Sequence, residues 1–174
     1  MQPSPTMAPT PQPRRDEVLA AMPAYDLRTV LANARALQRA ARAGAAPQPL
    51  LRGKNFGLWC EAIDAADAVL FRSAATDLGA HVAHVRPSLT ATSTPLEVQH
   101  TARVLGRLYD AVECLGMAPA LVAQVSRWAG VPVFDGLARA DHATAPLAEH
   151  LDHADTPTEN RRTVLQAVLL SSVT

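Results

Sequence analysis

The sequence NFGLWCEAIDAADAVLFRSAATDLGAHVAHV (residues 55–85) contains the pattern that decides the fold. Its first six residues, 55–60, form a short apolar run typical of a buried strand, and residues 81–85 form a second such run. Between them lies a helical segment that opens at Asp64 and stops at Gly79, a residue type common just after a helix C-terminus. Two strands joined by such a helix are expected to lie parallel in one sheet, with a right-handed connection.

The same alternation continues after residue 85. The apolar spacing predicts a Ser/Thr/Pro-rich loop at 87–95, a helix around 98–105, a strand at 109–114, a helix at 120–129 and a strand at 131–134. Strands that alternate with helices of this length form parallel sheets with helices on both faces. We therefore expect an α/β protein with three layers, α/β/α, around a four-stranded parallel sheet.

Further elements flank this core. Residues 1–13 are rich in proline, with Ser, Thr and Gln between, so we expect a disordered tail there. Apolar residues at helical spacing over 27–41 predict a helix with Asp26 as its N-cap. Residues 156–159 (TPTE) have the form of a capping box and predict a C-terminal helix. We expect three parts: the tail at 1–13, a domain at 14–155 and the helix at 156–174.

Composition excludes several classes of partner. Lys+Arg and Asp+Glu number 16 each, so the formal net charge is zero, and nothing favours binding to nucleic acid or an anionic membrane. No apolar run approaches the roughly 20 residues of a membrane-spanning helix. Arg14-Arg15 is followed by two acidic residues instead of an apolar export signal. We therefore expect a cytoplasmic protein that binds neither nucleic acid nor membranes.

Four stretches resemble one enzyme family: LRGKNFGLW (51–59), AATDLGAHVAHVRPS (74–88), TARVLGRLYDAVE (101–113) and WAGVPVFDGL (128–137). In this order they resemble the carbamoyl-phosphate-binding domain of the ornithine and aspartate carbamoyltransferase family, and ornithine carbamoyltransferase above all. The resemblance implies the parallel sheet described above and trimerisation through this domain. It also places the helix face of Arg103 and Arg107 near subunit contacts.

The family enzymes have a second domain that binds the amino acid, and the chain leaves no room for it. The stretch TENRRTVLQAVLLSS (158–172) resembles the family's closing helix, and the helix at 27–41 resembles its opening helix. The resemblance therefore implies a truncated ornithine carbamoyltransferase-like chain. Its amino-acid-binding domain is absent, whereas the two helices that cover apolar surface of the first domain remain.

The phosphate site of the family is degenerate here. Family enzymes hold the phosphate of carbamoyl phosphate with a Ser-x-Arg-Thr-Arg motif at a helix start. The matching positions are Asp64, Ala66, Asp67 and Ala68. Two cations are thus replaced by alanine, and two anions are introduced. Because a charge-assisted hydrogen bond contributes about 1.5–3 kcal/mol, we expect little remaining affinity for a dianion.

The rest of the family's site also departs from its pattern. Leu115 occupies the place of a further arginine after the third strand. The family's His-Pro-Thr-Gln motif, which contacts the carbamoyl group, reads His142-Ala143-Thr144-Ala145, so its glutamine is lost. We therefore expect no catalytic residue, no metal ion and no cofactor.

A structural role can account for the two aspartates. Asp64 is a good N-cap residue, and Asp67 in the first helical turn suits the helix dipole. We prefer this interpretation to a new catalytic carboxylate pair. It leads to the hypothesis that the Asp64 carboxylate accepts an N–H from residue 66 or 67 and fills the place of the phosphate.

Two other groups of residues invite a functional interpretation. His and carboxylate side chains are dense over 141–155, and His150 and His153 have helical i, i+3 spacing, but no known ligand spacing completes a metal site. A solvated polar surface is the preferred interpretation. Cys60 and Cys114 end two strands that the resemblance makes neighbours, which would bring the thiols close together. We prefer small buried hydrophobes to a redox pair.

Three functions remain open. The first is a catalytically inactive carbamoyltransferase-like protein, a pseudoenzyme with an assembly or regulatory role, which forms a homo-oligomer (a trimer) or joins a paralogous carbamoyltransferase. The alternative is a small-molecule-binding module whose cleft, lined by Asp64, Asp67 and His142, takes a neutral or cationic ligand. The third and least favoured is residual carbamoyl transfer to an amino acid at a site shared with another chain.

Overall fold

The four predicted strands form one parallel sheet. The computed structural model describes residues 26–44 and 48–173, so the predicted tail at 1–13 lies outside the described residues. The strands are β1 (Asn55–Trp59), β2 (His81–Val85), β3 (Ala111–Cys114) and β4 (Val133–Asp135), and their order in the sheet is β2-β1-β3-β4. The expected α/β class is therefore confirmed.

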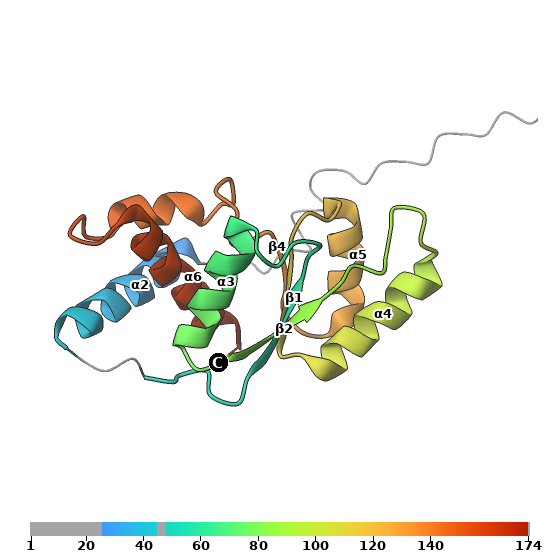
Figure 1. The fold of residues 1–174 in the computed structure, drawn as a ribbon, viewed down its shortest axis with the longest axis horizontal. Helices are drawn as coiled ribbons and strands as arrows, with labels where there is room; N and C mark the ends of the chain where they lie inside the picture. Colours follow the sequence, from blue (N-terminus) through green and yellow to red (C-terminus); the bar gives the residue numbers. More distant parts are fainter. Residues whose placement is uncertain (1–25, 45–47, 174) are drawn as a thin grey trace, which may run out of the picture.

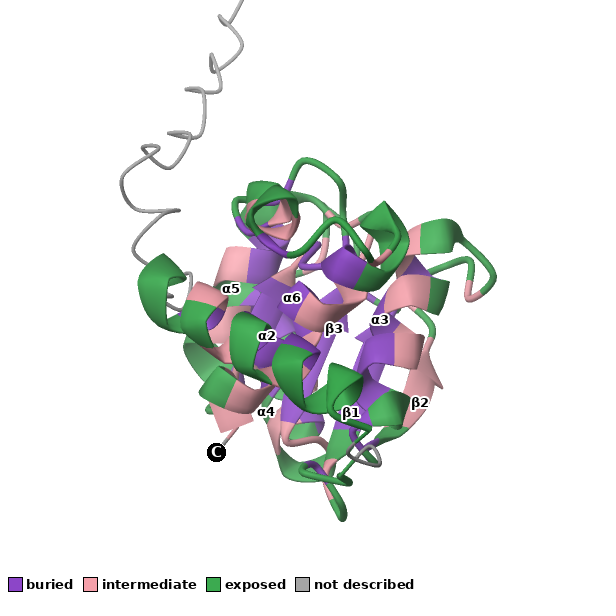
Figure 2. Ribbon diagram, turned by 90° about the vertical axis from the view of Figure 1, so that its left-hand side faces the viewer, coloured by how far each residue is buried: buried purple, intermediate pink, exposed green. Residues whose placement is uncertain are grey.

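Helices cover both faces of the sheet (Figure 1). One face carries α2 (Leu27–Arg42), α3 (Ala66–Asp77) and α6 (Pro157–Val173), and the other carries α4 (Pro95–Leu108) and α5 (Pro119–Ala129). The core correspondingly consists of two clusters, one on each face. Figure 2 looks onto the exposed outer side of α2, with the buried parts of α3, α6 and the sheet beyond it.

The strand order creates a crevice between β1 and β3. Phe56 of β1 lies opposite Val82 of β2 on one side and opposite Ala111 of β3 on the other. The chain leaves β1 through α3 on one face of the sheet and leaves β3 through α5 on the opposite face. Such a switch point leaves space beyond the carboxyl ends of the strands, where parallel α/β folds bind their ligands.

Two helix starts and one helix end lie where they were predicted. The Asp26 carboxylate accepts the Arg28 N–H of α2 at 3.1 Å. At α6 the Thr156 N–H donates to the Glu159 carboxylate at 2.8 Å, and the Glu159 N–H donates to the Thr156 hydroxyl at 3.2 Å, which completes the capping box. Gly79, just beyond α3, has a φ of +85°, a conformation that glycine adopts without strain.

Helices α4 and α5 approach each other so closely that Gly106 is required. A Cβ atom at this position would lie 1.7 Å from the carbonyl oxygen of Ala129. Any larger residue would therefore push α4 away from α5. The two helices form one layer whose outer surface is shared between them.

The closing helix α6 is part of the core and not an appendage. Its apolar side chains are fully buried against the sheet face and against α2 and α3: Val164, Leu165, Ala167, Val168 and Leu169. Gln38 of α2 donates to the Asn160 side chain at 3.0 Å, and Asn160 donates to the Asp152 carbonyl at 3.1 Å. A 3₁₀ helix, η1 (Ala145–His150), precedes α6, and only residues 151–156 connect the two.

Replacing Leu165 by alanine should therefore destabilise the whole domain. We expect Leu165→Ala to lower the free energy of unfolding by about 2–5 kcal/mol, because a cavity remains in a closely packed core. Chemical denaturation followed by circular dichroism measures this change. The matched control is Leu50→Ala, which removes the same atoms from a side chain that is 48% exposed and should change stability by about 0.5 kcal/mol or less. Equal effects of the two substitutions would contradict a core role for α6.

Candidate functional site

A cleft of about 440 Å³ lies at the carboxyl ends of β1 and β3. Its walls come from the β1–α3 connection, the loop after β2 and the connection from β3 into α5. The residues that line it are Cys60, Glu61, Ala62, Ala65, Asp67, Pro87, Leu89, Thr90, Ala91, Leu115, Gly116, Met117, Ala118 and Leu121. The cleft therefore occupies the crevice that the strand order creates.

The charge in this cleft is negative. Two carboxylates, Glu61 and Asp67, line it, and no lysine or arginine does. Among the described residues neither carboxylate takes part in a hydrogen bond or an ion pair. Arg139 lies within electrostatic range of Asp67, but its Nε donates to Asp141 at 2.8 Å. The pKa of Arg139 is raised chiefly by this hydrogen bond, and the charge of Asp67 adds to the rise at longer range.

The predicted capping role of Asp64 is wrong. The N-cap of α3 is Ala65, whose ψ of 145° is extended, and no side chain caps this helix start. Residues 62–65 form a turn in which the Ala65 N–H donates to the Ala62 carbonyl at 3.3 Å. The turn moves the cap one residue along the chain and leaves the Asp64 side chain exposed. The hypothesis that the Asp64 carboxylate fills the phosphate place is therefore contradicted, whereas Asp67 does lie in the first turn of α3.

The other positions singled out in the sequence are divided between the cleft and its surroundings. Asp67 and Leu115 line the cleft. Ala66 is exposed at the start of α3, and Ala68 is fully buried in the core. Asp64, His142, Thr144 and Ala145 are not among the lining residues, so the expected lining by Asp64 and His142 is corrected.

His142 and Thr144 instead belong to a buried polar network. The Thr144 N–H donates to His142 Nδ1 at 3.2 Å, and the Thr144 hydroxyl lies 2.9 Å from the same nitrogen. Arg161 of α6 donates to the Thr144 hydroxyl oxygen at 3.2 Å and to the Leu137 and Arg139 carbonyls. Because burial and the charge of Arg161 both disfavour a second proton, the pKa of His142 falls to about 4.

Sequence reasoning missed Arg161. It is only 9% exposed, and its burial lowers its pKa. The available signal was its position on α6, since Arg161, Val164, Leu165 and Val168 follow the i, i+3, i+4, i+7 spacing of one helix face. An arginine on an apolar stripe must find buried acceptors, and here they are backbone carbonyls of the segment after β4.

Glu113 of β3 is a second buried ionisable side chain that the sequence did not reveal. Its side chain is fully buried, and its Oε1 accepts the Ala138 N–H at 3.1 Å. Its Oε2 has no hydrogen-bond partner among the described residues. Burial raises the pKa of Glu113 to about 8, and the charge of Arg161 opposes this rise. The carboxyl group is therefore protonated near neutral pH.

The two cysteines lie on opposite faces of the sheet. Cys60 packs in the cluster beneath α2, α3 and α6, whereas Cys114 packs in the cluster beneath α4 and α5. β1 and β3 are neighbours, so the backbones near Cys60 and Cys114 are close. Side chains alternate between the two faces of a sheet, however, and the two thiols lie on opposite faces. Burial raises the pKa of both thiols. Packing is thus the supported role, and the expected proximity of the two thiols is wrong.

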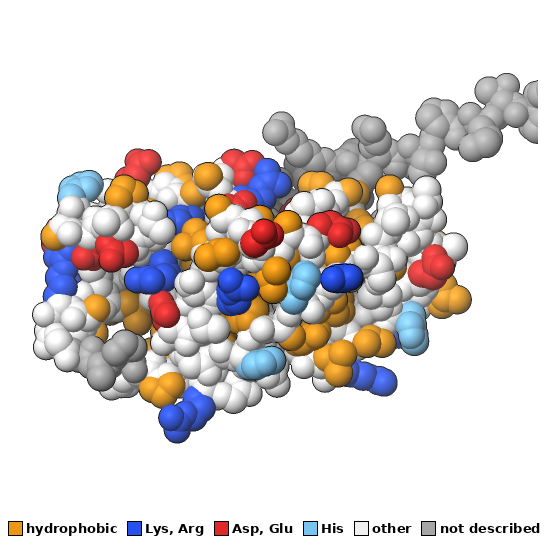
Figure 3. All heavy atoms as spheres, viewed as in Figure 1, with side chains coloured by type: hydrophobic (Ala, Val, Ile, Leu, Met, Phe, Trp, Pro, Cys, Tyr) orange, Lys and Arg blue, Asp and Glu red, His pale blue; other side chains and the backbone are white. Residues whose placement is uncertain are grey.

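The polar stretch at 141–155 forms ion pairs and no metal-binding cluster within the part of the chain that the structure describes. Asp141 pairs with Arg139, and Asp152 and Asp155 pair with Arg42. No described helix is long and apolar enough to cross a membrane. On the face seen in Figure 3, acidic and basic side chains are scattered without a patch of one sign.

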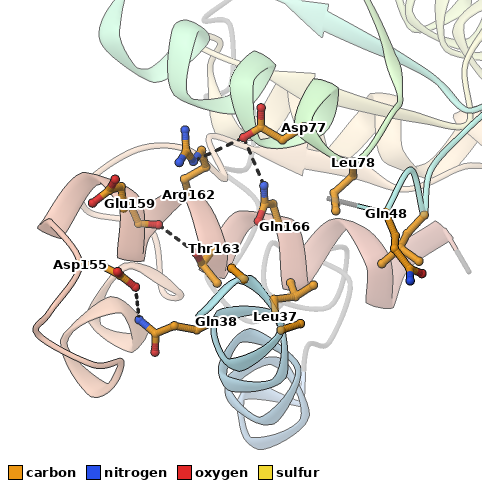
Figure 4. A pocket seen from close by; sticks show the side chains of 13 residues that line it. Leu37, Gln38, Gln48, Asp77, Leu78, Asp155, Glu159, Arg162, Thr163 and Gln166 are labelled. Atoms are coloured by element: carbon orange, nitrogen blue, oxygen red, sulfur yellow. Dashed lines mark hydrogen bonds and ion pairs between the residues drawn. The ribbon is translucent and has the colours of Figure 1, made fainter. Parts of the chain in front are cut away.

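A larger hollow of about 560 Å³ lies between α2, α6 and the end of α3 (Figure 4). Its polar rim is already paired within the protein. Asp77 interacts with Arg162 and Gln166 at 3.5 Å each, and Asp155 accepts from Gln38 at 2.6 Å. A ligand would have to displace these contacts, so the cleft beside Asp67 is the better candidate site despite its smaller volume.

Comparison with known proteins gives the same family as the sequence motifs. No protein-family model matches the chain. The chain is 42% identical over 113 residues to the ornithine carbamoyltransferase of Cutibacterium acnes, covering 63% of this chain and 34% of that enzyme. It is 38% identical over 142 residues to the catabolic ornithine carbamoyltransferase of Burkholderia mallei, covering 80% of this chain and 42% of that enzyme.

Solved structures of ornithine carbamoyltransferases also superpose on the chain. Ornithine carbamoyltransferase from Pyrococcus furiosus superposes with a TM-score of 0.61 at 27% identity, over 72% of this chain and 40% of that chain. The enzyme from Burkholderia thailandensis has a TM-score of 0.58 at 20% identity, over 71% of this chain and 42% of that chain. The chain is ornithine carbamoyltransferase-like. It spans less than half the length of the ornithine carbamoyltransferases named here.

The two shifted pKa values make stability depend on pH in opposite directions. Glu113 titrates near 8 in the folded chain and near 4.5 in the unfolded chain, so its contribution to stability falls as pH rises between these values. His142 titrates near 4 in the folded chain and near 6.5 in the unfolded chain, so its contribution rises with pH between these values. Below pH 6.5 the contributions of Glu113 and His142 to the free energy of unfolding change in opposite directions. Above pH 6.5, of these two groups, only Glu113 still changes it.

We therefore expect the free energy of unfolding to fall by about 2 kcal/mol between pH 6.5 and 8, since one pKa unit corresponds to about 1.4 kcal/mol. Urea denaturation at intervals of half a pH unit measures this slope. Glu113→Gln keeps the shape but cannot ionise, so it should remove most of the slope. Glu149→Gln, which alters an exposed carboxylate, should keep it. A slope unchanged in Glu113→Gln would contradict the assignment.

Proposed function

We propose that this protein is a carbamoyltransferase-like pseudoenzyme with an assembly or regulatory role. The observation that carries the proposal is the lining of the cleft by Glu61 and Asp67, without a lysine or arginine. Binding of a phosphate dianion requires cations or several aligned donors. A cleft whose only charges are carboxylates repels such a ligand, so the first step of carbamoyl transfer lacks its binding energy.

The connection between η1 and α6 supports the same proposal. Only residues 151–156 join these elements, and α6 packs against α2 and α3 in the core cluster that also contains sheet residues. There is thus no folded unit between them that could hold an amino-acid acceptor over the cleft. Two substrates must be held in a defined geometry for group transfer to be efficient, and this part of the chain supplies neither holder.

The surface for assembly would be the outer side of α4 and α5. It carries four large apolar side chains, Leu96, Val104, Leu108 and Trp128, which are 73, 41, 59 and 45% exposed. The Arg103 guanidinium lies 5.5 Å from the Trp128 ring centroid, a cation–π contact. Apolar side chains gathered on one helix layer, with arginine among them, are typical of protein interfaces. The partner would be a second copy of the chain or an intact carbamoyltransferase.

Carbamoyl phosphate should not bind. We expect isothermal titration calorimetry to give no saturable heat with millimolar carbamoyl phosphate, because the loss of two arginines removes contacts of about 1.5–3 kcal/mol each. We also expect no citrulline when ornithine is added. The double variant Ala66→Arg, Asp67→Thr should gain measurable phosphate binding, since both positions lie in the exposed or half-buried first turn of α3. Tight, saturable binding by the unmodified chain would contradict the proposal.

Assembly should depend on the α4–α5 surface. Light scattering coupled to size exclusion should give a mass above the 18.5 kDa of one chain, alone or after mixing with an ornithine carbamoyltransferase. Leu108→Glu should return the protein to single-chain mass, because it places a charge in the apolar contact. Val69→Glu is the control, as Val69 is 39% exposed on α3, away from this surface. A chain that stays monomeric and ignores the enzyme would count against assembly.

A second candidate function is a small-molecule-binding module. The specific observation that favours it is the cleft itself, whose size and mostly apolar walls suit a small ligand. Its carboxylates are without partners among the described residues and so remain available as acceptors. A thermal-shift screen with amines, amino acids and nucleotides tests it, because a ligand of the folded state raises the melting temperature. A screen without any such rise would contradict it.

A further inference from the structure

We propose that the cleft at the carboxyl ends of β1 and β3 binds a primary amine with an apolar body. The inference rests on the second candidate function, the small-molecule-binding module, and names the ligand class. It follows from the arrangement of charge and apolar surface in the cleft. The charged lining residues all come from the β1–α3 connection, and the connection from β3 into α5 contributes no charged lining residue.

The charged wall is the β1–α3 connection. Glu61 follows β1 after one residue, and Asp67 lies in the first turn of α3. Neither is paired with another described residue. The arginines within electrostatic range of Asp67 are held elsewhere, Arg139 by Asp141 and Arg161 by backbone carbonyls and Thr144. An ammonium group that approaches either carboxylate therefore breaks no existing hydrogen bond or ion pair of the described residues.

The apolar wall comes from the connection between β3 and α5. Leu115 and Met117 are partly exposed there, and Leu121 in the first turn of α5 also lines the cleft. Leu89, from the loop after β2, is a further apolar lining residue. A hydrocarbon body laid on this surface loses contact with water, and a flexible methionine can adapt to its shape. Leu115 has particular weight, because it stands where the family resemblance would place a phosphate-binding arginine.

The arrangement favours a singly charged, one-headed ligand. An anion meets carboxylates alone, and a neutral alcohol of the same length gains only the apolar contact. The cleft volume of about 440 Å³ is near the lower end of the roughly 300–1,000 Å³ typical of small-ligand sites, so the body must be short. A six-carbon primary amine fits these requirements and makes a suitable probe.

Calorimetry with three probes of equal length tests the proposal. Hexylamine, 1-hexanol and hexanoate are titrated separately into the full chain at pH 7.5. We expect hexylamine to bind at one site, at least about tenfold more tightly than 1-hexanol, as a charge-assisted contact predicts, and hexanoate to bind most weakly. Asp67→Asn and Glu61→Gln should each weaken hexylamine severalfold and leave 1-hexanol unchanged. Met117→Ser should weaken both ligands alike.

Matched controls distinguish failure of the amine proposal from failure of the proposed small-molecule-binding module. Glu149→Gln removes an exposed carboxylate outside the cleft and should leave hexylamine binding unchanged, and thermal unfolding confirms that each variant folds. If 1-hexanol binds as tightly as hexylamine, the inference is overturned while the binding module stands. If amino acids or nucleotides stabilise the chain but hexylamine does not bind, the amine proposal is likewise overturned and the binding module stands. If no ligand of any class binds, both fall.

Discussion

The packing of α6 into the core cluster that it shares with α2, α3 and the sheet is the interaction on which the remaining structure depends. Its apolar residues fill the cluster shared with α2, α3 and the sheet, and without them this face of a small domain would be open to water. The contact is not purely apolar. Arg161 enters the same interface, and donating to the backbone carbonyls of Leu137 and Arg139 and to Thr144 offsets the loss of hydration of its charge. The helix thereby holds the segment after β4 in place.

This interface also shapes the electrostatics behind the cleft. Glu113 lies fully buried in β3 and His142 is buried beside Thr144, and neither carries charge near neutral pH. The charges that reach the cleft are those of Glu61 and Asp67. Asp67 has two consequences at once, because a carboxylate in the first turn favours the helix dipole of α3 and the same carboxylate repels a phosphate. At position 67 an acidic residue therefore stabilises the start of α3 and at the same time disfavours binding of an anion.

The two faces of the sheet are suited to different tasks. Beneath α2, α3 and α6 the core is closed, and the hollow between these helices is edged by side chains that already pair with one another. The α4–α5 layer instead leaves large apolar side chains exposed on its outer side, and Gly106 keeps its two helices in close contact. Protein contacts and ligand binding can therefore occupy separate surfaces, so the assembly role and the binding of an amine are compatible.

The sequence by itself determined the features whose causes are local. The α/β class, the Asp26 and Thr156 caps and the turn at Gly79 depend on spacing and on hydrogen bonds within a few residues. The sequence also shows directly that Ala66, Ala68 and Leu115 are not arginines. That these positions correspond to phosphate-binding arginines is what the family resemblance implies, and it stays a prediction. Only the tertiary structure decided the rest. One tight turn after β1 moved the cap from Asp64 to Ala65, strand alternation set Cys60 and Cys114 on opposite faces, and burial of Arg161 and Glu113 arose from partners more than 20 residues away in the sequence. Burial and charge at a site depend on which distant segments meet, and local patterns do not contain that information.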